Sequence, residues 1–272
     1  MYTLAMTLTC SLLNHTQIRE DDAVLSFPTE RSRALFIYLA MHPDQELSRE
    51  HLAGLLWPES SSTHARRSLR GALSRTRQTI QDAQRVPPIL YPNRRAISLR
   101  GEEIWVDVHA LTRLLDNWQA HRHPTGELCA ACIRSLEEAA HLYAGPFLQD
   151  IFITQAQPFE EWVIFQREVL HNRVIAAQNA LLDVYVARGG WQQVIHAARR
   201  LLALAPWEEE IHIQLMQALV LNGQRGAALQ HYAVAGHVLR EELDVEPGPR
   251  LRACYERIRQ DVPTVVEPRR QA

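Results

Sequence analysis

The stretch THARRSLRGALSRTRQTI, residues 63–80, holds five arginines and no acidic residue. On a helical period of 3.6 residues, one side carries Ala65, Leu69, Ala72, Thr76 and Ile80, and the other carries Arg66, Arg70, Ser74 and Arg77. Serines at 60–62 supply capping hydroxyl groups, so we predict an amphipathic helix with an outward basic face. Guanidinium groups pair with phosphate oxygens, or bidentately with guanine O6 and N7. The pattern therefore favours DNA binding, and a solvated surface helix is the alternative that charge alone leaves open.

The segments on both sides of this helix follow a definite order. Alternating apolar residues predict a strand over 4–12, and a second strand over 23–27 follows a polar turn at 14–22. Helices are predicted over 30–41 and, after a capping serine at 48, over 49–57. Strands over 89–91 and 96–99 flank a hairpin that carries Arg94 and Arg95. This order is that of a winged helix-turn-helix, whose third helix enters the major groove while the wing reaches phosphates or a minor groove.

The second half of the chain is predicted to be helical. A strand-like lead-in and a helix over 101–115 end the first half, and helical apolar spacing then covers 128–147, 159–188, 191–205, 208–222, 225–243 and 252–261. A spacing of 34 residues relates Leu181 to Leu215 and Gly189 to Gly223, which is the tetratricopeptide period. A generic helical bundle is the alternative.

These patterns together predict a mainly α protein with a small β component. We expect a winged helix-turn-helix over 1–118, a linker at 119–125, an all-α tetratricopeptide-like domain over 126–262 and a polar tail at 263–272. If the basic helix were only a surface feature, the repeats would make the chain a protein-interaction scaffold without specific DNA binding.

The distribution of charge and the composition limit the possible partners and the cellular location of the protein. All 29 basic residues are arginine, and residues 62–100 carry nine of them against one acid, giving this module +8 while the remainder sums to −10. Four cysteines give no disulfide framework, and no stretch approaches the ~20 apolar residues of a membrane span. We therefore expect a cytoplasmic protein with no membrane partner.

Several stretches together resemble one bacterial family. They are LSREHLAGLLWP at 47–58, ARRSLRGALSRTR at 65–77, LYAGPFL at 142–148, LALAPWEEEIHIQLM at 202–216 and LREELDVEPGPRL at 239–251. They are similar to the antibiotic-regulatory-protein type (SARP) of transcriptional activator, which joins an OmpR/PhoB-like winged helix to a bacterial transcriptional activation domain. The resemblance implies binding of double-stranded DNA at promoter-proximal direct repeats as a homodimer. It also implies that the helical repeats couple the protein to its dimer partner, a ligand or the RNA polymerase holoenzyme.

The resemblance also implies which residues contact DNA. On the basic helix they are Arg66, Arg67, Ser68, Arg70, Ser74 and Arg77, and in the wing they are Arg94 and Arg95. Ser68 stands where the family often has asparagine, and Thr76 where it commonly has a larger apolar residue. Gly71 lies in the middle of the helix, and our hypothesis is that it permits close approach to DNA or to the helix over 49–57. An ordinary tolerated glycine is the alternative.

No pattern of catalytic residues is recognisable. The chain lacks Gly-x-Ser-x-Gly, His-Glu-x-x-His and a glycine-rich phosphate loop, so we expect neither an enzyme nor a cofactor. One cluster, His121, His123, Cys129 and Cys132, has the donor types of a tetrahedral zinc site. Because the two cysteines fall three residues apart in a predicted helix, we interpret them as small buried thiols and expect no metal. A zinc or redox-sensing site is the alternative.

Overall fold

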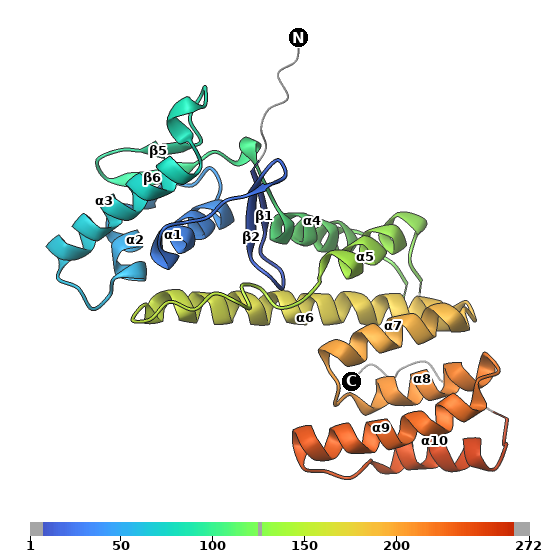
Figure 1. Cartoon of the computed structure of the whole chain (residues 1–272). Coiled ribbons are helices and arrows are strands. Elements are labelled where there is room, and N and C mark those ends of the chain that lie inside the picture. Colours follow the sequence, from blue (N-terminus) through green and yellow to red (C-terminus); the bar gives the residue numbers. More distant parts are fainter. Residues whose placement is uncertain (1–7, 125–126, 264–272) are drawn as a thin grey trace. The chain divides into compact units, whose positions relative to one another are not determined.

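The chain forms two compact units that interleave along the sequence (Figure 1). The computed structural model describes residues 8–124 and 127–263. The first unit comprises the described residues up to Leu114 together with His141–Leu170, and the second comprises Leu115–Ala140 and the described residues from His171 onward. The predicted fold class, mainly helical with a small N-terminal β component, is confirmed. The contiguous domain boundaries at 119–125 stay a prediction.

A four-stranded sheet opens the first unit. Its order is β3 (Ala23–Val24), β2 (Gln17–Glu20), β1 (Leu8–Ser11) and β7 (Ile104–Val106). β1 pairs antiparallel with β2 and parallel with β7, and Cys10 faces Ile18 across the first pair. The prediction of a polar turn over 14–22 is wrong, because β2 occupies its residues 17–20. In that strand Ile18 and Glu20 are buried between exposed neighbours, and one apolar residue in four is too weak a signal.

Two further strand predictions need correction. Residues 4–7 of the first predicted strand lie outside the described residues. The second, predicted over 23–27, is reduced to the two exposed residues of β3. Its short pairing with β2 gives it no buried face, so its apolar residues do not mark a full strand.

Three helices follow at the predicted places. They are α1 (Glu30–Met41), α2 (Arg49–Leu56) and α3 (Ser62–Thr79), and their N-caps are Thr29, Ser48 and Ser61, each of which accepts a backbone N–H of its own first turn. α3 packs against both α1 and α2 through its apolar stripe. The buried Thr76 lies on this stripe, and its Oγ1 donates to the carbonyl oxygen of Ser32 at 3.1 Å. The buried hydroxyl of Thr76 therefore has an acceptor within the core, which makes threonine tolerable at a position where the family commonly has a larger apolar side chain.

The wing is a three-stranded sheet of order β4 (Leu47–Ser48), β6 (Ala96–Leu99) and β5 (Leu90–Pro92). The hairpin between β5 and β6 is confirmed. The Oδ1 atom of Asn93 accepts the backbone N–H groups of Arg95 and Ala96 at 2.8 and 2.7 Å, which forms the turn. β4 was not predicted, because two residues are too short to show a period. Short 3₁₀ turns, η1 (Asp82–Gln84) and η2 (Gly101–Glu103), flank the wing on either side.

The segment 141–170 completes the first unit although it lies far along the chain. Leu13 forms a β-bridge with Phe147, and the backbone N–H of Leu148 donates to the carbonyl oxygen of Leu12 at 2.8 Å. The Asp150 carboxylate accepts both the N–H and the hydroxyl of Thr16. From α6 (Gln157–Ala187), the ring of Trp162 lies 4.8 Å from that of Tyr38. These contacts make the start of the predicted second domain part of the N-terminal core.

The described residues of the second unit form helices and the loops that connect them. Besides the second half of α6, it contains the end of α4 (Asp107–Ala120), most of α5 (Ala130–Leu142), α7 (Trp191–Leu204), α8 (Glu209–Leu221), α9 (Arg225–Leu243) and α10 (Pro249–Arg259). Helix α8 packs on α7, α9 and α10. Gly189 and Gly223, the repeated pair, end α6 and α8 with φ of 67° and 77°. Glycine adopts this left-handed region without steric cost from a Cβ, which explains its recurrence at both helix ends.

A histidine pair, the buried His212 of α8 and the half-buried His231 of α9, joins these two helices. His212 is 2% exposed, and its Nε2 lies 2.8 Å from the carbonyl oxygen of Pro206. Because a carbonyl only accepts, Nε2 carries the proton, and the Nδ1 of His212 accepts from the Nε2–H of His231 at 2.8 Å. Burial lowers the pKa of both imidazoles, that of His231 to about 4. Both rings are therefore neutral at pH 7.

Candidate nucleic-acid interface

The exposed face of α3 carries the predicted contact residues. Arg66, Arg67, Arg70 and Ser74 are exposed, whereas Ser68 and Arg77 are half-buried. No acidic residue lies in the first turn of the helix. The positive charge of these side chains is therefore not neutralised by α3 itself, and the face is open to an anionic partner.

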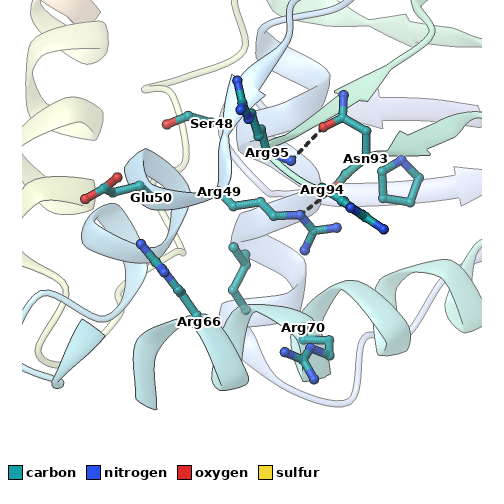
Figure 2. A pocket seen from close by; sticks show the side chains of 10 residues that line it. Ser48, Arg49, Glu50, Arg66, Arg70, Asn93, Arg94 and Arg95 are labelled. Atoms are coloured by element: carbon teal, nitrogen blue, oxygen red, sulfur yellow. Dashed lines mark hydrogen bonds between the residues drawn. The ribbon is translucent and has the colours of Figure 1, made fainter. Parts of the chain in front are cut away.

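The hairpin tip is fixed to the start of α2 rather than projecting alone. The backbone N–H of Arg49 donates to the carbonyl oxygen of Arg95 at 2.8 Å. The Nε–H of Arg49 donates to the carbonyl oxygen of Asn93, also at 2.8 Å (Figure 2). Arg49 therefore joins the wing to the helix-turn-helix and adds its own charge to the surface. Sequence reasoning missed it, because it reads only as the first residue of a capped helix.

These elements enclose an open cavity of about 1010 Å³, shown in Figure 2. We call it the arginine hollow and define it by Arg49, Arg66, Arg70, Arg94 and Arg95, which come from α2, α3 and the hairpin. Four of the eight predicted contacts line it, and Arg67, Ser68, Ser74 and Arg77 are not among its lining residues. Glu50 adds a single negative charge to the same lining. Five guanidinium groups around one hollow repel each other, and phosphate oxygens would relieve that repulsion.

The end of α3 is tied to the wing by a buried carboxylate. Asp82 is 0% exposed, and its Oδ1 accepts the backbone N–H groups of Ile89 and Leu90 at 2.8 and 3.1 Å. Its Oδ2 accepts the Nε–H of Arg77 at 2.8 Å. One nitrogen of Arg77 is therefore used to hold the entry of β5, and a DNA contact by this residue stays a prediction. Sequence reasoning counted Asp82 only as a lone acid.

The close-approach hypothesis for Gly71 is wrong in its protein half. A Cβ added there would meet the guanidinium of Arg75, on its own helix, at 3.5 Å as its nearest neighbour. This is ordinary van der Waals contact, and α2 offers no nearer atom. Close approach to DNA remains the untested half.

Four possible metal ligands meet in the second unit. The Nδ1 or Nε2 atoms of His121 and His123 and the Sγ atoms of Cys129 and Cys132 all lie within 4.8 Å of one another. Cys132 is buried, but Cys129 is exposed and precedes α5, so the interpretation of two buried helical thiols is wrong for Cys129. The backbone N–H of Cys132 and the imidazole of His121 lower the pKa of Cys129 to about 6.

A winged helix with a basic hollow, together with a unit of packed helices, is the architecture expected of a transcriptional regulator. Residues 106–259 match the family model of the bacterial transcriptional activator domain, which is more than half of the chain. The chain therefore belongs to this family and is a SARP-type transcriptional regulator. Members of this family regulate transcription.

Named relatives agree with this assignment. The transcriptional regulatory protein MoaR1 of Mycobacterium tuberculosis is 26% identical over 243 residues, 88% of this chain and 75% of MoaR1. The regulatory protein AfsR of Streptomyces coelicolor is 26% identical over 255 residues, 91% of this chain but 24% of AfsR. The structure of Mycobacterium tuberculosis EmbR in complex with a low affinity phosphopeptide aligns with a TM-score of 0.62 and 24% identity, covering 95% of this chain and 66% of EmbR. At that identity the likeness concerns the fold alone.

Among the helices of residues 8–124 and 127–263, none is both long enough and apolar enough to cross a membrane.

Proposed function

We propose that this chain regulates transcription by binding specific double-stranded DNA with α3 and the hairpin tip. The observation that carries the proposal is the arginine hollow, in which three separate elements direct positive side chains to one place. A solvated surface helix needs no such convergence, because its charges have no common target.

Each element has a distinct role in this proposal. α3 enters the major groove, where Arg66, Arg67 and Arg70 reach base edges or the flanking phosphates. Arg94 and Arg95 hold the backbone or the adjacent minor groove. Ser74 and the half-buried Ser68 have short side chains, which suit phosphate or water-mediated contacts better than bidentate base reading.

The helical unit would bind other molecules and would not itself select the DNA sequence. Family membership supports an activator that binds promoter-proximal direct repeats as a homodimer and recruits the RNA polymerase holoenzyme. Such a protein acts in the cytoplasm. The surfaces between its repeats would hold the dimer partner, a ligand or the polymerase.

The test begins with selection of bound sequences from a random duplex pool by the full chain. Fluorescence anisotropy on the selected duplex and on a scrambled one then follows affinity against salt. If the five arginines of the hollow each neutralise one phosphate, log Kd changes with log salt at a slope of about 4.5 per protomer, roughly 500-fold between about 50 and about 200 mM.

Variants separate the two kinds of contact. Replacing a base-reading residue by Arg70→Ala should cost about 1–3 kcal/mol on the selected duplex and relax preference at one base pair. Replacing a phosphate contact by Arg94→Ala should weaken all sequences and reduce the slope by about 0.9. Arg134→Ala, at an exposed position on α5, is the matched control and should change neither.

The scaffold alternative predicts the opposite pattern. Selection would then enrich no sequence, and wild type, Arg70→Ala and Arg94→Ala would bind every duplex equally and weakly. That result would overturn the proposal.

A further inference from the structure

The donor atoms at the junction of α4 and α5 are spaced as a metal requires. The Sγ atom of Cys132 lies 3.2 Å from the Nδ1 of His121 and 3.2 Å from the Nε2 of His123, and the Sγ of Cys129 lies 3.7 Å from the Nδ1 of His121. Zinc–sulfur and zinc–nitrogen bonds of about 2.3 and 2.0–2.1 Å in a tetrahedron place sulfur and nitrogen about 3.6 Å apart. The observed spacings scatter about that value.

We propose that His121, His123, Cys129 and Cys132 bind one zinc ion in a tetrahedral site of two nitrogens and two sulfurs. Thiolate and imidazole are the ligands that zinc prefers, and four protein ligands leave no position for water. The ion is therefore structural. It goes beyond the proposed DNA binding, because these residues lie outside the unit that contains the arginine hollow.

Local structure supports thiolate ligands at this place. Cys129 immediately precedes α5, and its carbonyl oxygen accepts the N–H of Ile133 at 3.1 Å, as an N-cap residue does. The backbone N–H of Cys132 points to the Sγ of Cys129 at 3.5 Å. The positive end of the helix and this donor both stabilise negative charge on sulfur. A metal-bound thiolate at Cys129 would keep these two stabilising contacts.

The two imidazoles favour zinc over a redox dithiol. A Cys-x-x-Cys pair at a helix start is also the arrangement of thiol oxidoreductases, but that chemistry needs only the two sulfurs. Here both histidine rings approach Cys132, and their centroids lie 5.8 Å apart in an edge-to-face arrangement. A Cys129–Cys132 disulfide would not explain why both imidazoles lie next to Cys132, whereas a shared metal ion would.

The ion would fasten a connection between two helices. α4 ends at Ala120, directly before His121, and Cys132 lies in the first turn of α5. The ligands thus come from the end of one helix and the start of the next. A zinc ion bound to all four would hold these ends together in the folded state and stabilise the second unit.

The first measurement is the metal content of the full chain, purified without a metal-binding tag or added metal. We expect about one equivalent of zinc by elemental analysis, and Cys129→Ser/Cys132→Ser should lose it. Because His121 is exposed, His121→Ala should also lose zinc without endangering the fold. Cys254→Ser, at a buried free cysteine in α10, and His141→Ala, at an exposed histidine in α5, are the matched controls and should keep it.

Cobalt substitution gives a second, spectroscopic readout. Wild type should show a thiolate-to-cobalt charge-transfer band and the strong visible bands of tetrahedral cobalt, and chelation should lower the thermal midpoint of wild type but not of the double variant. Less than one-tenth equivalent of zinc together with no charge-transfer band on adding cobalt would overturn the proposal. Detection of a Cys129–Cys132 disulfide in metal-free native protein would also overturn it, in favour of the redox interpretation.

Discussion

Replacing Asp82 should destabilise the wing, and the size of the effect depends on which acceptors are lost. The Asp82→Ala change removes the acceptor for the N–H groups of Ile89 and Leu90, which are 0% and 1% exposed. A buried donor left without a partner costs about 1–3 kcal/mol. The partly exposed Arg77 can turn to water, so its loss adds little. We therefore expect Asp82→Ala to lower the free energy of unfolding by about 3–5 kcal/mol.

The Asp82→Asn change tests the same reasoning more finely. The amide oxygen can still accept both backbone N–H groups, but the amide NH₂ then faces the Nε–H of Arg77, so donor meets donor. The expected loss is about 1–2 kcal/mol, clearly smaller than for alanine. Asp22→Ala, at an exposed position in the same unit, is the control and should stay within about 0.5 kcal/mol of wild type.

The assay is urea unfolding of the full chain by circular dichroism, combined with amide hydrogen exchange of the peptide that covers the hairpin. Exchange reports on the wing locally, so loosening there appears even when the second unit is unchanged. Faster exchange at Ile89 and Leu90 in the order alanine, asparagine, wild type would support the assignment. Equal stability of both variants and wild type would refute it, since Asp82 would then not be the acceptor that holds β5.

Three further changes test other parts of the structure. Gly71→Ala should raise the free energy of unfolding in urea by up to about 1 kcal/mol, because the added Cβ meets no obstacle. A simultaneous loss of DNA affinity would show close approach to DNA. Gly223→Ala should lower the free energy of unfolding by about 1–2 kcal/mol, because the alanine would be strained at φ of 77°. Gly226→Ala, in open space within α9, is the control and should not destabilise the protein. Equal effects of the two changes would contradict the argument from backbone strain. His231 has a folded pKa of about 4 against 6.5 unfolded, so the unfolded state binds protons first and stability falls as pH drops from 6.5 toward 4. With allowance for solvent screening, urea unfolding at pH 5 should show a loss of about 1–2 kcal/mol relative to pH 7.5. His231→Gln, which can still donate to His212, should remove most of it; an unchanged pH dependence would assign the effect elsewhere.

Local sequence determined most of the helices and the hairpin turn, although α4 runs to Ala120 instead of 115 and α5 ends at Leu142 instead of 147. The bounds of α1 and α9 match the prediction, and α2, α3 and the hairpin strands shift by one or two residues at most, because capping groups and apolar periods act over a few neighbouring residues. The repeated glycines were also readable, since a left-handed helix end restricts the residue type locally. The charge of α3 and its outward face follow from the same short-range pattern.

Tertiary structure decided which of these segments meet. The residues near Asp82 in the sequence do not indicate that its carboxylate is buried against the wing. The side chain of Arg49 is held by the hairpin, which lies more than 40 residues away in the sequence. The segment 141–170 joins the N-terminal core through partners such as Leu13, which no local period encodes. The helical pattern wrongly predicted that Cys129 lies within a helix. α5 begins only at Ala130, and in this arrangement the sulfur atoms of Cys129 and Cys132 both lie near the two histidines. Local forces select the elements, whereas burial and long-range pairing, which depend on the whole chain, bring distant side chains into one site.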